Sequence, residues 1–131
     1  MLSEYFNKND GLGILATADS DGNVNIALYA KPHFIDENTI AFIMADRLSH
    51  ANLATNPRAA YLFKENGPGY KGKRLYLVKT KEDTDTALID NLRRKKIPAE
   101  IKKKTGERFL VYFKIEKTIE LTSAGDNRSG I

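Results

Sequence analysis

The sequence predicts a mainly β protein with short helices, folded as a six-stranded antiparallel β-barrel. About six apolar or alternating segments of strand length follow one another along the 131 residues. Most connections between them have hairpin character, and helical segments are too few for a parallel sheet covered by helices. Several of these strands are apolar on both faces. Closing the sheet into a barrel would bury one face and remove the exposed edges.

The composition is that of one soluble globular domain spanning residues 1–131, with a flexible polar tail over 123–131. Apolar residues make up 41% of the chain and charged residues 29%. The chain has no cysteine, which excludes disulfides and thiolate metal sites. It has no apolar core of signal-peptide length and no stretch near the roughly 18–20 apolar residues of a membrane span. We therefore expect a cytoplasmic protein that does not cross a membrane.

The N-terminal part is expected to form a helix over residues 3–9, capped by Ser3, followed by a hairpin. The first hairpin strand covers 13–18 and a tight turn lies at 20–22. The second strand covers 23–30 and alternates in character. One face of that strand carries Val24, Ile26 and Leu28, and the other carries Asn25, Ala27 and Tyr29.

The next segment, residues 34–57, is predicted to form a strand followed by a helix that ends at a proline. Phe34 and Ile35 lead into a turn at 36–38, and 40–45 is a wholly apolar strand. A partner subunit is expected to cover the outer face of that strand. A helix over 48–55 ends at Asn56-Pro57, since proline cannot continue it. One face of this helix is expected to carry Leu48 and Ala51, with Thr55 as a further candidate.

The remaining elements are two strands, a helix and a final strand. Strands are expected at 59–63 and 74–78, joined by a glycine-rich loop over 65–72. A helix over 84–96 then ends before Pro98, and the alternating segment 108–115 forms the last strand.

Charge is distributed unevenly along the chain. Residues 1–63 contain 4 basic and 7 acidic side chains, whereas residues 64–131 contain 17 and 10. Much of the basic excess lies between residues 93 and 104. Such a run could attract nucleic acid, but the favoured interpretation is a solvated helix face and loop.

The strongest candidate site is the polar turn from Asp46 to His50, between the apolar strand and the helix. A helix N-terminus presents unpaired backbone N–H groups and the positive end of a dipole. Arg47 and Ser49 would add a guanidinium and a hydroxyl donor, which together favour a phosphate. The alternative is that Asp46 simply caps the helix beside exposed polar side chains.

Other site chemistries receive less support from the residues. The two histidines, His33 and His50, have no carboxylates at ligand spacing, so no metal site is predicted. No nucleophile accompanies His50, so no catalytic triad is predicted. The loop from Asn66 to Gly72 lacks the spacing of a dinucleotide-binding or P-loop motif.

The order of these elements, with the motif R-x-S-x-x-N-L-x-x-N-P-R, resembles the pyridoxamine 5′-phosphate oxidase-like FMN-binding split barrels. The motif residues here are Arg47, Ser49, Asn52, Leu53, Asn56, Pro57 and Arg58. The sequence is most similar to the short stand-alone FMN-binding proteins of that superfamily, which also carry an Asn-Gly-Pro-Gly loop like residues 66–69. The resemblance covers about residues 11–78, and the rest only by order of elements.

This resemblance implies a split barrel that forms a homodimer with FMN at the subunit interface. The residues implied along the flavin are Asn25, Ala27, Leu28 and Tyr29, with Ile43, Met44 and Ala45 beside them. The residues implied at the phosphate are Arg47 and Ser49, with His50 and Asn52 in the same motif. Because relatives often carry a lysine where this chain has Leu48 and Ser49, Arg47 would supply most of the charge.

The implied role is a small redox protein, either a flavin reductase or an electron carrier, with a small-molecule or protein redox partner. No residue identifies the electron donor or acceptor, so the sequence leaves open whether the protein is an FMN-dependent oxidoreductase. Pyridoxamine phosphate oxidase activity itself is not expected, because the chain is short and lacks a counterpart of the substrate-phosphate residues. Two alternatives remain: a nucleic-acid-binding module that uses residues 93–104, or the same barrel binding F420 or haem.

Overall fold

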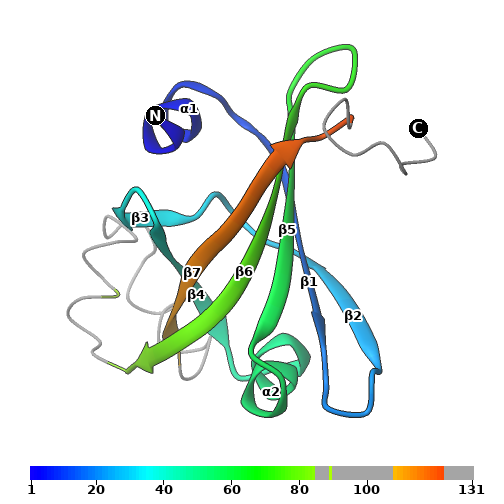
Figure 1. The fold of residues 1–131 in the computed structure, drawn as a ribbon, viewed down its shortest axis with the longest axis vertical. Helices are drawn as coiled ribbons and strands as arrows, with labels where there is room; N and C mark the ends of the chain where they lie inside the picture. Colours follow the sequence, from blue (N-terminus) through cyan, green and yellow to red (C-terminus); the bar gives the residue numbers. More distant parts are fainter. Residues whose placement is uncertain (85–88, 90–107, 123–131) are drawn as a thin grey trace, which may run out of the picture.

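The computed structural model describes residues 1–84, 89 and 108–122. Its seven strands form one antiparallel sheet in the order β2-β1-β5-β6-β7-β4-β3 (Figure 1). The elements are α1 (Leu2–Lys8), β1 (Gly11–Ala18), β2 (Val24–Leu28), β3 (His33–Asp36), β4 (Thr39–Ala45), α2 (Leu48–Thr55), β5 (Arg58–Glu65), β6 (Gly72–Asp83) and β7 (Arg108–Glu120). The mainly β, antiparallel architecture predicted from the sequence is confirmed.

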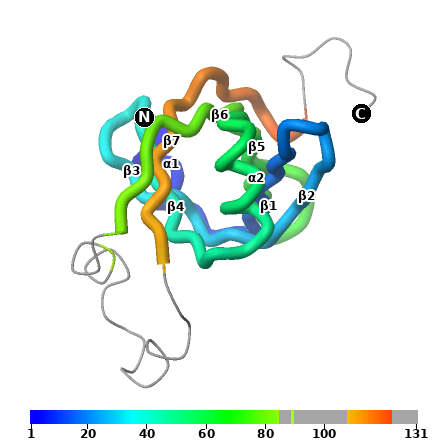
Figure 2. Tube along the Cα trace, turned by 90° about the horizontal axis from the view of Figure 1, so that it is seen from below, coloured from blue at the N-terminus to red at the C-terminus, as the bar shows by residue number. Residues whose placement is uncertain are grey.

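The sheet curls around a common axis, so that its strands surround a single core (Figure 2). The two helices lie at opposite ends of the barrel, with α2 beside the lower ends of β5 and β1 in Figure 1. The interior is filled by large apolar side chains with at most 3% exposure. They include Phe6, Leu15, Phe42, Leu53, Tyr61, Phe63, Leu75, Leu77 and Phe113.

The strand count is seven rather than six because β3 forms a strand of its own. It pairs with β4 through His33 and Phe34, and a register shift lies between Phe34 and Asp36. A strand of four residues is too short for an alternation pattern to be recognised. Strands β6 and β7 also extend beyond the predicted 74–78 and 108–115, because their charged outer halves remain paired with each other.

Three predicted segments lie outside the described residues: most of the helix 84–96, the basic segment 93–104 and the tail 123–131. Within the first of them, Ile89 is described as helical and is 3% exposed. It belongs to a second apolar cluster with Ala41, Leu110 and Tyr112, against which Ile43 packs. On the outer face of β4 this cluster buries Ala41, whereas Ile43 and Ala45 are only half-buried. That a partner subunit covers the rest of this face stays a prediction.

Three large, strongly exposed apolar side chains lie together on β2. Val24, Ile26 and Leu28 are 80%, 71% and 71% exposed, whereas the residues between them are half-buried. The predicted alternation of this strand is thus confirmed. Strand pairing continues the same face across Ile14, Ala16, Ala60 and Leu62. We call these seven residues the β2 face.

Both short helices differ from expectation in detail. Met1, not Ser3, occupies the N-cap of α1, and the Ser3 hydroxyl donates to the Glu37 carboxylate. Helix α2 has the predicted bounds but faces inward with different residues, namely Ser49, Asn52 and Leu53. Leu48, Ala51 and Thr55 do share one face of the helix, but this face is exposed, with Leu48 at 57%. The buried Asn52 amide donates to Thr17 Oγ1 of β1 at 3.1 Å, so a polar contact sets the rotation of α2.

No helix among the described residues is both long enough and apolar enough to span a membrane.

Candidate functional site

A cleft of about 540 Å³ lies where β2, the end of β4 and the start of α2 meet. Its volume falls within the range of about 300–1,000 Å³ that is typical of small-molecule sites. The residues lining it are Asn25, Ile26, Ala27, Leu28, Tyr29, Ala30, Ile43, Ala45, Arg47, Leu48, Ser49 and Arg108.

Most residues predicted from the resemblance come together around this cleft. Those that line it are Asn25, Ala27, Leu28, Tyr29, Ile43, Ala45, Arg47 and Ser49. The cleft also includes four residues that the sequence did not indicate as ligand contacts: Ile26, Ala30, Leu48 and Arg108. Arg108 is brought there by the pairing of β4 with β7, which sets it opposite Ala45. The sequence alone does not indicate Arg108 as a cleft residue, because its place depends on the register of β4 with β7.

The start of α2 forms one end of the cleft and has the features of an anion-binding site. Arg47 occupies the N-cap in an extended conformation, and no side chain of the described residues caps the helix by a hydrogen bond. The first turn contains no acidic residue. The helix therefore keeps unpaired N–H groups and the positive end of its dipole beside the Arg47 guanidinium. The alternative in which Asp46 caps the helix is not what the structure has.

Ser49 supplies a sheltered hydroxyl at the same end. The residue is only 4% exposed, and the Asn25 amide of β2 donates to its Oγ at 3.3 Å. A second contact joins it to the Tyr29 hydroxyl. Burial raises the pKa of Tyr29, and the hydrogen bond with Ser49 and the positive charge of Arg108 only partly oppose that effect. Tyr29 therefore stays a neutral donor between Ser49 and Arg108 at physiological pH.

The segment that leads from β2 to β3 is fixed from inside the barrel. The Tyr61 hydroxyl of β5 donates to the carbonyls of Ala30 at 3.1 Å and of Tyr29 at 3.3 Å. Burial raises the pKa of Tyr61 well above its usual range, so this donor keeps its proton. Gly13 lies directly below, where a Cβ atom would come within 1.9 Å of that hydroxyl. A side chain at this position would therefore displace the wall of the cleft.

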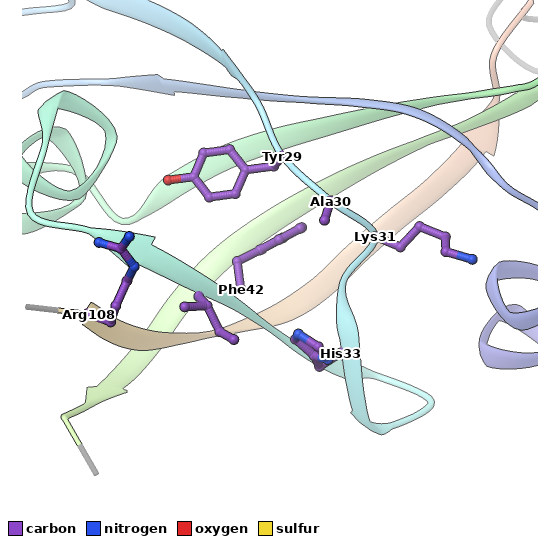
Figure 3. A pocket seen from close by; sticks show the side chains of 7 residues that line it. Tyr29, Ala30, Lys31, His33, Phe42 and Arg108 are labelled. Atoms are coloured by element: carbon purple, nitrogen blue, oxygen red, sulfur yellow. The ribbon is translucent and has the colours of Figure 1, made fainter. Parts of the chain in front are cut away.

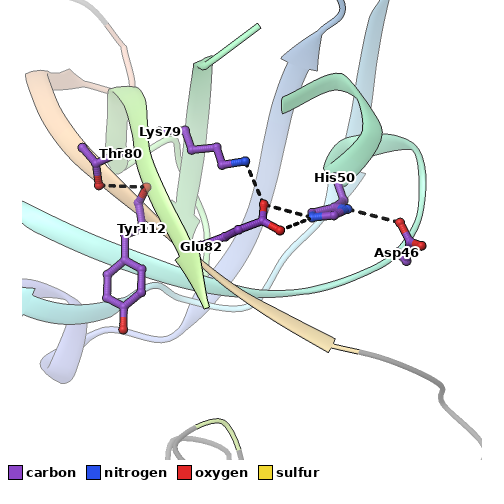
Figure 4. Close-up of polar contacts among 6 residues, drawn as sticks. All are labelled: Asp46, His50, Lys79, Thr80, Glu82 and Tyr112. Carbon is purple, nitrogen blue, oxygen red and sulfur yellow. Dashed lines mark hydrogen bonds and ion pairs between the residues drawn. The ribbon is translucent and has the colours of Figure 1, made fainter. Parts of the chain in front are cut away.

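Three predicted site residues take other places among the described residues. Met44 is 0% exposed and belongs to the barrel core. Asn52 holds α2 to β1 through Thr17, as described above. His50 is not among the residues that line the cleft, and it contacts Glu82 of β6 and Phe109 of β7 (Figure 4 shows the contact with Glu82).

His50 is the centre of a charged cluster. Its Nδ1 lies 3.2 Å from Asp46 Oδ1, and its Nε2 lies 3.0 Å from Glu82 Oε2. The Lys79 ammonium donates to Glu82 at 2.7 Å, and the imidazole stacks on Phe109 with ring centroids 4.0 Å apart. Glu82 reaches His50 because β6 extends beyond the strand predicted from the sequence. A carboxylate oxygen thus lies within hydrogen-bonding distance of each ring nitrogen of His50.

This cluster predicts a pH-dependent contribution to stability. Burial acts to raise the pKa of Glu82, but the hydrogen bonds and positive charges of Lys79 and His50 outweigh it and hold the pKa below its usual value. A carboxyl whose pKa is lower in the folded state stabilises the fold above its unfolded pKa and loses that effect as pH falls through the folded value. We expect Glu82→Gln to lower the free energy of unfolding by about 1 kcal/mol at pH 7.

The measurement is urea denaturation of both proteins at pH 7 and again below the unfolded pKa of glutamate, about 4.3. The difference between wild type and variant should shrink at the acidic pH. A difference that stays constant between the two pH values would contradict the assignment.

Comparisons with known proteins show which fold this is. No sequence-family model and no curated protein matches the chain. An FMN-binding protein from Syntrophomonas wolfei subsp. wolfei has a similar structure, with a TM-score of 0.71 and 22% identity over 89% of this chain and 81% of that chain. An F420 reductase has a TM-score of 0.66 and 17% identity over 88% of this chain and 94% of that chain. A Listeria innocua protein assigned as a pyridoxamine 5′-phosphate oxidase has a TM-score of 0.67 and 13% identity over 93% of this chain and 96% of that chain.

The matches span most of each molecule, so the similarity concerns the whole fold and not one part of it. The chain therefore has the split-barrel fold of the pyridoxamine 5′-phosphate oxidase-like proteins.

Proposed function

We propose that this protein binds FMN in the cleft and works as a small homodimeric redox protein. The observation that carries the proposal is the uncapped start of α2, with Arg47 and the sheltered Ser49 at one end of a cleft of ligand size. When bound, a flavin supplies the redox chemistry itself, and the protein contributes position and electrostatics. The similarity to an FMN-binding protein supports the choice of FMN.

The donor set fits a phosphate. Phosphate groups bind well to helix N-termini that also offer an arginine and a hydroxyl. Arg47 would hold the phosphate by its guanidinium, and Ser49 would orient it with Asn25 as support. No acidic side chain is among the residues that line the cleft. A doubly negative ligand would therefore meet only neutral and cationic groups there.

The rest of the cleft fits a flat ring. Residues 25–30 of β2 and its extension form one wall, with small and apolar side chains such as Ala27 and Ala30. Ile43 and Ala45 of β4 form the opposite wall. Such a slot admits close approach of the β2 backbone to a ring. Tyr29, fixed by packing edge-on against Phe42 at 5.7 Å, would limit its orientation.

The direct test is cofactor uptake by the purified protein. We expect a yellow protein with flavin absorbance, close to one FMN per subunit, and a higher melting temperature when FMN is added to flavin-free protein. A colourless protein whose melting temperature does not respond to FMN would overturn the proposal.

A dimer would explain the exposed β2 face. Ile26 and Leu28 line the edge of the cleft and are each 71% exposed, so a partner packed on this face would also close the cleft. We expect Ile26→Glu to convert a dimer into a monomer, because it places a charge in the centre of an apolar interface. The measurement is analytical ultracentrifugation, with FMN titration in parallel, where the monomer should bind more weakly.

The matched control for that prediction is Ile35→Glu. Ile35 is also a half-exposed apolar residue in an edge strand, but on β3 at the other end of the sheet order. It should leave the dimer intact. A wild-type protein that is monomeric at every concentration, or an Ile26→Glu protein that stays dimeric, would contradict the proposed interface.

A related cofactor is the second candidate, because an F420 reductase is among the proteins of similar structure. The absorption spectrum of the protein as purified from cells separates FMN from F420 and from haem. Equilibrium titrations with each cofactor then rank their affinities. If F420 binds more tightly than FMN, F420 and not FMN is the cofactor of the cleft.

A further inference from the structure

A second cavity, of about 390 Å³, adjoins the cleft. It is lined by Tyr29, Ala30, Lys31, His33, Phe42, Ile43 and Arg108, and we call it the side chamber (Figure 3). Four of these residues also line the cleft: Tyr29, Ala30, Ile43 and Arg108. The two hollows therefore share a wall. A molecule in the side chamber would lie against whatever occupies the ring end of the cleft.

The charged side chains that line the chamber are cationic. Lys31 and Arg108 stand at its two ends with the imidazole of His33 between them, and none of the seven lining residues is acidic (Figure 3). The Lys31 ammonium is fixed at the side facing α1, where it donates to the Phe6 carbonyl at 2.8 Å and to Asp10 at 2.9 Å. The Asn9 carbonyl at 3.1 Å completes this set of partners, so Asp10 balances the Lys31 charge and the guanidinium of Arg108 is the main cation of the chamber. Such a concave, one-signed lining favours an anion.

The remaining walls are apolar and flat. Phe42 is 2% exposed and meets the Tyr29 ring at an interplanar angle of 82°, so the two rings form a rigid corner. Ile43 lies beside them. The volume is near the lower end of the range for small-molecule sites, enough for a single ring rather than a dinucleotide. Apolar ring walls with a cationic rim match a planar ring that carries one acidic group.

We propose that the side chamber binds a small aromatic carboxylate, with its ring in the Tyr29–Phe42 corner and its carboxylate between His33 and Arg108. This inference rests on the proposed function in one respect: the bound acid would lie beside the flavin and so belong to the substrate class of the same site. The chamber itself is a feature of the protein without any cofactor. It can therefore be tested separately.

The experiment uses benzoate as the charged probe and benzamide as its neutral isostere. Both are titrated by calorimetry into the FMN-loaded protein and into the flavin-free protein. Benzoate should bind both forms at least roughly tenfold more tightly than benzamide, because only benzoate has a charge for the cationic lining. Its affinity should fall as salt is raised. FMN should neither displace benzoate nor be displaced by it.

His33→Glu is the decisive variant, because His33 lines the side chamber but is not among the residues lining the cleft. It should weaken benzoate binding roughly tenfold or more and leave FMN affinity within about twofold. Ile35→Glu is the matched control, since it adds the same charge to the same strand outside both cavities. It should change neither affinity.

Three results would overturn the proposal: benzoate that binds no better than benzamide, benzoate that competes with FMN, or benzoate affinity that His33→Glu leaves unchanged. Competition would mean that the chamber is part of the cofactor cleft. Failure of FMN to bind at all would overturn the proposed function only, because the flavin-free titration still decides whether the chamber takes an aromatic acid.

Discussion

Arg47→Ala should weaken FMN binding roughly 30-fold, or about 2 kcal/mol, while riboflavin affinity stays nearly unchanged. Arg47 lines the cleft at the uncapped start of α2 and would supply the charge nearest the proposed phosphate. Riboflavin is the same ring system without the phosphate, so the comparison isolates that contact. The measurement is equilibrium titration of flavin-free protein, followed by quenching of flavin fluorescence.

The matched control for this prediction is Arg58→Ala. Arg58 is another exposed arginine, paired with Glu116 at 2.8 Å and not among the residues lining the cleft. Its removal should leave both affinities within about twofold. Equal losses for FMN and riboflavin in Arg47→Ala would place the phosphate elsewhere, for example at Arg108, which lines the same cleft.

Phe63→Ala should lower the free energy of unfolding by about 3–5 kcal/mol, the largest effect on stability that we expect. Phe63 is 0% exposed and packs its ring against Phe6 at 4.9 Å and Tyr5 at 6.1 Å. It thus joins β5 to α1 across the end of the barrel opposite α2. Removing the ring would leave a cavity that a strand and a short helix cannot easily close. Urea denaturation at pH 7 measures the change.

Tyr70→Ala serves as the control for that variant, because Tyr70 is 72% exposed on the loop after β5. It should alter the free energy of unfolding by less than about 0.5 kcal/mol. A loss below about 1 kcal/mol in Phe63→Ala would instead mean that α1 is not part of the cooperative core.

The sequence predicted the features that depend on local hydrophobic periodicity and on residues that end a helix or form a turn. Helix α2 has the bounds 48–55 that Pro57 and the turn at Asp46 indicated, and the alternation of β2 assigned each residue to its face. Both features are local, because the spacing of apolar residues and the fixed backbone geometry of proline act within a few residues of the chain.

Features that depend on packing could not be predicted in the same way. The inward face of α2 carries the polar Ser49 and Asn52 beside Leu53, and Asn52 bonds to Thr17 of β1. Arg108 reaches the cleft only through its register with Ala45. His50 meets Glu82 only because β6 continues past its apolar half. Each of these contacts joins elements distant in sequence, which no local pattern encodes.

The strand order has a consequence for how the molecule is made. The two ends of the sheet, β2 and β3, are neighbours in the chain, whereas β4 pairs with the C-terminal strand β7. The cleft needs all three parts: β2, β4 and Arg108 of β7. Pairings so distant in sequence form late, since the intervening chain must first be ordered. During synthesis on the ribosome, the cleft can therefore be completed only after β7 has emerged.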